Sequence, residues 1–181
     1  MSLDLLLEKL PEVDAWVDRT LAEHASQARS VESFGFARLA GYYPVSLLRT
    51  AKVVGLPRVP MPPLSRMGLL GFEEFENLNA AGITYKDTYF VCASHLREEA
   101  LHFHELVHVV QWQHLGVRNF ILAYALGHLL GGGYDGNPLE RTAYALQARF
   151  DAGEASFDAP AHARSDAERD CRALLRQVGL G

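Results

Sequence analysis

The segment HELVHVVQ, residues 104–111, limits what this chain can fold into more than any other stretch. His104 and His108 stand four residues apart in a run that is otherwise largely apolar. In a helix, this spacing places both imidazoles on one side, on adjacent turns, with Glu105 just beside them. A helix that is apolar on most sides is expected inside a protein, so these three polar side chains would be buried together.

The burial of two imidazoles and a carboxylate costs several kcal/mol unless they are paired or bound to a cation. Zinc meets that need, because it takes neutral imidazole nitrogens about 2.0–2.1 Å away and leaves a carboxylate free to reach a bound water. The pattern therefore predicts a Zn²⁺ site with His104 and His108 as ligands and Glu105 as general base. The alternative is a metal-free buried helix whose histidines are ordinary core residues.

A catalytic zinc site needs a third protein ligand, and His114 is one candidate. The stretch HELVHVVQWQH has the spacing of the metzincin pattern HExxHxxGxxH, but Gln111 stands where that pattern has a glycine. Without the glycine the helix continues, and His114 lies about 120° from His108 around its axis. Metzincins also have a methionine turn after the motif, whereas all three methionines here lie upstream of it. His114 is therefore not favoured.

The favoured third ligand is Glu140, in the stretch GNPLERTAYAL. A carboxylate from a later helix that packs beside the first would complete a set of two histidines and one glutamate. Asn137 and Glu140 also have the spacing of a capping box, which explains the glutamate without any metal. The two roles need different directions of the Glu140 side chain, so only one can hold. Asp135 and His128 remain as alternative ligands.

The rest of the sequence predicts a mostly helical chain with a small sheet. Apolar residues recur at spacings of three and four in segments that predict helices over about 3–31, 45–54, 94–115, 119–130, 138–150 and 164–178. We expect Ser94 to cap the motif helix and Gly116 to end it. The stretch ITYKDTYFVC, residues 83–92, predicts a hairpin that turns at Lys86-Asp87. The prolines between positions 57 and 63 predict an extended surface connection.

A chain of 181 residues is long enough to bury a core without disulfides, and its two cysteines lack CxxC spacing. We expect one α+β domain over residues 1–181, predominantly helical, with a small antiparallel sheet or hairpin. Residues 1–81 would form a helical N-terminal part with the proline-rich connection. Residues 82–150 would form the metal-site core, and residues 151–181 a C-terminal tail with one helix.

Charge and hydropathy indicate which partners and which cellular location to expect. The formal net charge is −5, with no block of consecutive lysines or arginines, which argues against nucleic acid or an anionic membrane as the main partner. Asp4 and Glu8 stand where a secretory signal needs positive charge. The longest apolar run, which starts at Phe120, is too short to span a bilayer. We therefore expect a cytoplasmic protein without a membrane span.

These features together resemble the gluzincin-type zinc metallopeptidases, in particular short bacterial domains built around an HELxHVVQ helix. The resemblance covers about residues 82–150, with ITYKDTYFV, HELVHVVQ and NPLERTAY in that order. It implies a zincin-like fold in which the strand before the motif helix edges the cleft and can bind an extended peptide. It also implies that His104, His108 and Glu140 bind zinc and that Glu105 is the general base.

One position departs from the better-known gluzincins. They often place an aspartate four residues after the ligand glutamate to orient a zinc-bound histidine, and this chain has Tyr144 there. Gln111 could orient a ligand instead. The resemblance implies zinc-dependent hydrolysis of a peptide or protein substrate. The alternatives are a zincin-fold protein that binds zinc without turnover, in a structural or regulatory role, and a metal-free helical interaction module.

Overall fold

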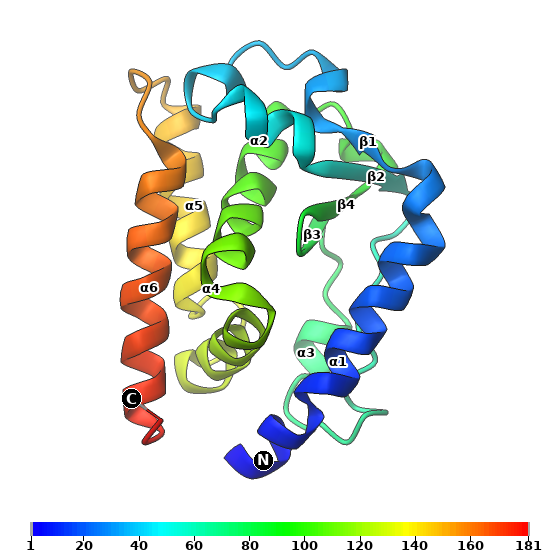
Figure 1. The fold of residues 1–181 in the computed structure, drawn as a ribbon, viewed down its shortest axis with the longest axis vertical. Helices are drawn as coiled ribbons and strands as arrows, with labels where there is room; N and C mark the ends of the chain where they lie inside the picture. Colours follow the sequence, from blue (N-terminus) through cyan, green and yellow to red (C-terminus); the bar gives the residue numbers. More distant parts are fainter. Residues whose placement is uncertain (1, 181) are drawn as a thin grey trace.

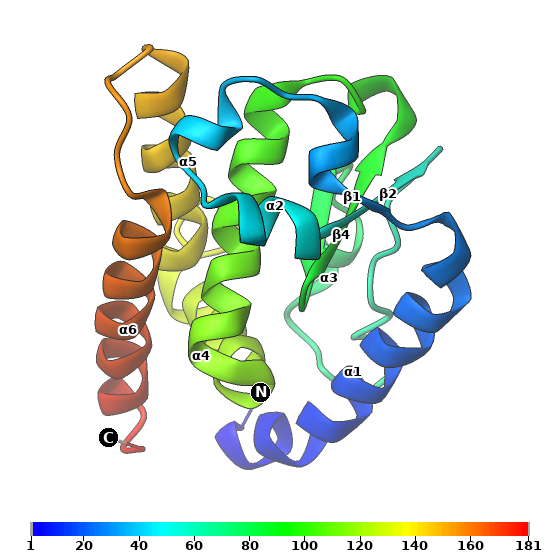
Figure 2. The same ribbon diagram turned by 45° about the horizontal axis from the view of Figure 1, so that its top comes forward.

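The computed structural model describes residues 2–180, in which six α-helices pack around one small sheet. The helices are α1 (Leu3–His24), α2 (Val45–Thr50), α3 (Glu73–Glu76), α4 (Glu99–Gly131), α5 (Pro138–Asp151) and α6 (Ala159–Gln177). The strands are β1 (Arg29–Ser30), β2 (Lys52–Leu56), β3 (Gly82–Tyr85) and β4 (Thr88–Cys92). Figure 1 shows α4 between two groups, α5 and α6 on one side and the sheet with α1 on the other. The turned view in Figure 2 keeps this order, and the expected α+β, predominantly helical class is confirmed.

The sheet is mixed, with the strand order β1-β2-β4-β3. The expected hairpin is present, since β3 and β4 pair antiparallel and the chain turns at Lys86 and Asp87. Lys86 adopts a φ of 57°, and its ammonium group contacts Asp14 and Asp18 on α1, which fastens the turn to that helix. β3 is an outer strand, so one of its edges has no neighbouring strand within the sheet.

Of the expected antiparallel sheet or hairpin, only the hairpin is found as such, because β2 runs parallel to β4 and makes the sheet mixed. The helix expected after Pro44 is correspondingly shorter and ends at Thr50, after which Lys52–Leu56 forms β2. The side chains of Val53 and Val54 are both buried, although they point to opposite faces of the sheet. A strand covered on both faces has no alternating pattern, and its apolar run therefore resembles the end of a helix in sequence.

The motif helix α4 begins at Glu99 rather than near Ser94, because residues Ala93–His95 form a short 3₁₀ turn. Gly116 interrupts it with φ 74° and ψ 164°, so the expected break at this glycine is confirmed. The first limb of α4, up to the break, is buried over residues 102–112, between the sheet and α5 with α6. Among residues 2–180, no helix combines the length and apolarity needed to cross a membrane.

Helix α5 begins as its sequence predicts, with Asn137 accepting a hydrogen bond from the amide of Leu139. Helix α6 starts at Ala159, several residues earlier than expected, because Asp158 caps it. The proline-rich connection has no helix or strand but does not simply follow the surface. Val59 and Pro62 are buried within it, so it closes one side of the core next to α1.

Candidate metal centre

Two helices bring three potential ligands together in the interior. His104 and His108 come from adjacent turns of the first limb of α4, and Glu140 comes from the first turn of α5. The two Nε2 atoms lie 3.1 Å apart. Glu140 Oε2 lies 3.4 Å from His104 Nε2, and Glu140 Oε1 lies 3.4 Å from His108 Nε2. These residues, the metal triad, are all at least 95% buried and could hold a metal ion.

The spacing of the metal triad fits a small tetrahedral cation. Around an ion with ligand atoms about 2.0–2.1 Å away, neighbouring corners of a tetrahedron lie about 3.3–3.4 Å apart. The two imidazole nitrogens are 3.1 Å apart and each lies 3.4 Å from one oxygen of Glu140, a different oxygen for each, so every pair is close to that value. The Glu140 carboxylate straddles the imidazoles, since each faces a different oxygen. Its buried Oε2 has no hydrogen-bond partner among residues 2–180, and a cation would satisfy it.

Both imidazoles are oriented from behind by glutamine side chains. The Nδ1 of His108 lies 2.8 Å from Gln111 Oε1, and the Nδ1 of His104 lies 3.0 Å from Gln147 Oε1. A carbonyl oxygen accepts only, so each Nδ1 donates, and in the neutral form of each imidazole the Nε2 lone pair faces the centre. Gln111 Nε2 also donates to the backbone oxygen of Leu139, 3.1 Å away, which joins α4 to the start of α5.

The charges within the metal triad compensate one another. Burial by itself would lower the pKa of His108, but the facing carboxylate of Glu140 outweighs it and raises that pKa to about 9. Burial would likewise raise the pKa of Glu140, yet the imidazoles of His108 and His104 hold it well below its usual range. A metal ion that binds these ligands must therefore displace a proton from His108.

Glu105 lies next to the metal triad, on the side that faces β3. Thr84 Oγ1 donates a hydrogen bond to Glu105 Oε2 over 2.6 Å. The other oxygen, Oε1, approaches Gly82 so closely that a Cβ atom there would lie 2.3 Å away. Burial raises the pKa of the Glu105 carboxyl, against the opposing effect of the nearby imidazoles. The sequence therefore puts its smallest residue where β3 passes this carboxylate.

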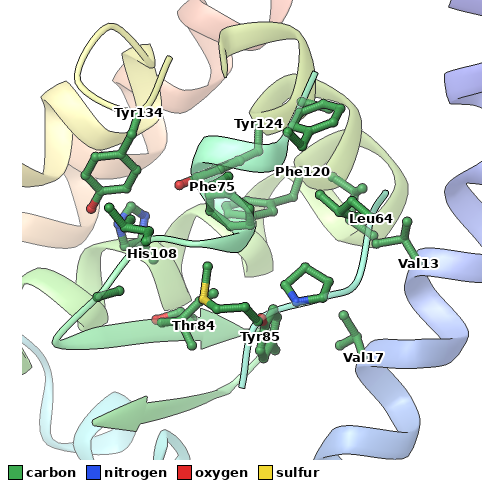
Figure 3. A pocket seen from close by; sticks show the side chains of 18 of the residues that line it. Val13, Val17, Leu64, Phe75, Thr84, Tyr85, His108, Phe120, Tyr124 and Tyr134 are labelled. Carbon is green, nitrogen blue, oxygen red and sulfur yellow. The ribbon is translucent and has the colours of Figure 1, made fainter. Parts of the chain in front are cut away.

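Three tyrosines surround the metal triad. Tyr124 donates a hydrogen bond of 2.7 Å to Glu140 Oε1. The ring of Tyr144 packs edge-on against His104, with centroids 4.6 Å apart. Tyr134, from the glycine-rich loop between α4 and α5, has its hydroxyl 3.2 Å from that of Tyr144. In Figure 3 this hydroxyl points toward the imidazole of His108.

The alternative ligands considered from the sequence lie away from the centre. His114 faces α6, with Nε2 3.7 Å from a carboxylate oxygen of Glu168. His128 stacks on Phe72, with ring centroids 5.2 Å apart. Asp135 is exposed in the loop before α5. The capping box is only half formed, because Asn137 caps α5 while the Glu140 side chain joins the imidazoles.

Residues of the site that the sequence reasoning missed include Gln147, Thr84 and Gly82. Glu140, Tyr144 and Gln147 follow one another at spacings of four and three, which places them on one face of α5, so a signal for Gln147 was present. Gly82 precedes the segment that predicts the strand, and no pattern in the neighbouring sequence predicts its contact with Glu105. Gln111, which was expected to orient a ligand, contacts His108 Nδ1 through its Oε1.

Comparison with known proteins was made against family models, curated proteins and solved structures, and none of them matches this chain.

Proposed function

We propose that the protein is a zinc-dependent hydrolase of peptide bonds with a zincin-like, gluzincin-type site. The observation that carries the proposal is the set of ligand-atom separations in the metal triad, 3.1 to 3.4 Å, with Glu105 packed beside it. Two imidazoles and one carboxylate form a ligand set known for catalytic zinc, which leaves a fourth position for water. A zinc ion there would supply Lewis acidity toward that water and toward a peptide carbonyl.

The residues around the triad have distinct proposed roles. Glu105 is within reach of the cavity that the triad lines, so it would take the proton of the attacking water and pass it to the leaving amine. The phenol of Tyr134 faces the same space and would donate to the carbonyl oxygen as negative charge develops on it. Gln111 and Gln147 would keep both ligand histidines in the tautomer that binds metal.

The outer strand β3 supports a peptide as the substrate. Ala81 O accepts a hydrogen bond from Cys92 N of β4. Thr84 O points away from β4 and accepts a hydrogen bond from the indole of Trp112. By the alternation of a strand, the peptide groups of Gly82 therefore point to the free edge, beside Glu105. An extended peptide could pair with β3 at this point and bring its own backbone to the metal triad.

The test combines metal content with hydrolysis. We expect one zinc per chain, and we expect Glu105→Gln to retain it while kcat on a mixed peptide library falls roughly 10²- to 10⁴-fold. His104→Ala should lose both zinc and activity. The matched control is His114→Ala, a histidine of the same helix that faces α6, which should retain both. Wild-type hydrolysis by Glu105→Gln would refute the base assignment, and zinc without cleavage by the wild type would favour a structural or regulatory site.

A further inference from the structure

The metal triad opens onto a cavity of about 110 Å³. Its walls come from distant parts of the chain, as Figure 3 shows: Val13 and Val17 of α1, Leu64 after the proline-rich connection, Phe75 of α3 and Phe120 of α4. Side chains of the metal triad line the same space. A group bound in the cavity would therefore sit directly beside the proposed reaction centre.

Away from the metal triad, Glu105 and Tyr134, the polar groups in the wall of this cavity are already paired. The hydroxyl of Tyr85 donates to Pro60 O over 2.8 Å, and the indole of Trp112 donates to Thr84 O over 3.1 Å. Tyr124 donates to the carboxylate of the metal triad over 2.7 Å. A polar side chain that entered this part of the cavity would lose its bonds to water and find no free partner, whereas an apolar one would gain by burial.

The size of the cavity limits what it can hold. An engineered protein cavity of about 150 Å³ binds benzene. The present cavity, at about 110 Å³, is smaller than that and suits a single aliphatic side chain of the size of leucine. It is too small for a long acyl chain, which separates a peptide side chain from a lipid tail as the occupant.

A second recess meets the first at the general base. It measures about 300 Å³, and Asn79, Glu98 and Gln147 line it, together with Gly82 and Glu105, which both recesses share. Asn79, Glu98 and Gln147 add amide and carboxylate groups that the mostly apolar wall of the cavity lacks. The two sides of the reaction centre thus offer different surroundings to the two halves of a substrate.

From these observations we infer that the cavity selects one large apolar side chain next to the bond that is cleaved, while the chain beyond that bond lies in the polar recess. The inference rests on the proposed function and adds the class of substrate. A peptide with leucine at that position is bound, and one with a polar side chain of similar shape is rejected.

The test uses two short peptide hydroxamates, identical except for leucine or asparagine beside the metal-binding group. Calorimetry on the zinc-loaded protein reads their affinity without any need for turnover. We expect the leucine compound to bind about 10- to 100-fold more tightly, since an unpaired buried amide is costly and buried leucine is favourable. Equal affinity, or no binding of either compound, would overturn the inference.

Two variants narrow the cavity from different walls, so that one misfolded protein does not decide the outcome. Ile121→Trp and Met61→Trp replace partly exposed lining residues of α4 and of the proline-rich connection. One methylene group too many in an apolar pocket changes binding about tenfold or more. We therefore expect each variant to reduce the preference for leucine to less than about threefold. Leu130→Trp is the control, because Leu130 is exposed on the same helix outside the cavity, and it should keep the full preference. An unchanged preference in both cavity variants would contradict the inference.

The same proteins separate failure of this inference from failure of the proposed function. A strong preference for the leucine hydroxamate in a protein that cleaves no peptide would support the cavity assignment and refute hydrolysis. Cleavage without any preference between leucine and asparagine substrates would support hydrolysis and refute the cavity assignment.

Discussion

Replacement of Gly82 by alanine tests the position of Glu105 without altering the metal triad. Gly82 is not among the glycines with positive φ, so its backbone suits alanine. The new Cβ atom, however, would lie 2.3 Å from Glu105 Oε1 and 2.8 Å from the carboxyl carbon. The carboxylate must therefore move, while the hydrogen bond from Thr84 to its other oxygen, 2.6 Å long, resists a simple rotation.

The size of the effect follows from this geometry. An ordinary contact starts near 3.4 Å, so Oε1 has to retreat by about 1 Å from its present place. A misplacement of about 1 Å in a catalytic group can cost about 10²-fold in rate, or roughly 2.7 kcal/mol in the barrier. The folded state should change little, because alanine at a compatible glycine position adds about 0.4–1 kcal/mol of stability, against the strain of the shift.

The assay is kcat on a cleaved peptide, with zinc content and Tm measured on the same protein. We expect kcat to fall roughly 100-fold while one zinc remains bound. Gly55→Ala in β2 is the control, since its Cβ would meet only the flexible end of Leu96, at 3.2 Å. In a Glu105→Gln background, Gly82→Ala should cause no further loss, because both changes act through one side chain. Wild-type kcat in Gly82→Ala, or full additivity, would refute the reasoning.

Three further predictions concern the residues that support the metal triad. Gln147→Ala removes the acceptor behind His104 and should weaken zinc binding about 10- to 100-fold in a competition titration with a chelator, whereas unchanged affinity would exclude an orienting role. Zinc must displace a proton from His108, whose pKa is raised to about 9, so affinity should rise about tenfold per pH unit up to that pH and then level off. Calorimetry in buffers of different ionisation enthalpy should detect about one released proton below pH 9, and a pH-independent affinity would contradict this. Tyr134→Phe should keep zinc and lower kcat about 10²- to 10³-fold, while Tyr144→Phe changes kcat less; equal losses would argue against Tyr134 as the donor.

The sequence was most informative where one segment determines its own structure. The break at Gly116, the cap at Asn137 and the turn at Lys86-Asp87 depend on residues within a few positions of each other, and all three are present as expected. The histidines of the HELVHVVQ helix share a face for the same local reason. Glu140 required a step beyond local geometry, namely that a buried pair of imidazoles needs a charged partner.

The features that the sequence did not reveal depend on contacts between distant segments. The parallel pairing of β2 with β4 joins residues 52–56 to residues 88–92, and no local pattern records it. The apolar cavity is assembled from α1, the proline-rich connection, α3 and α4, and each contributes side chains that would be ordinary core residues elsewhere. A glycine is needed at position 82 because the carboxylate of Glu105, a residue of another element, leaves no room for a Cβ atom. Sequence periodicity reports which face is buried, but not what covers it.

The arrangement behind the ligand histidines has a consequence for the charge of the site. The residue four positions after Glu140 is Tyr144, and His104 is held by Gln147, one turn further along the same face of α5. His108 is held by Gln111 in the same way. Both orienting groups are neutral amides, so the nearest negative charges to a bound zinc ion are the carboxylates of Glu140 and Glu105. A carboxylate behind a histidine makes that ligand more basic and gives more electron density to the metal. Two amides fix the imidazoles without this effect, which leaves a divalent ion in this site more strongly electrophilic toward water and a carbonyl oxygen.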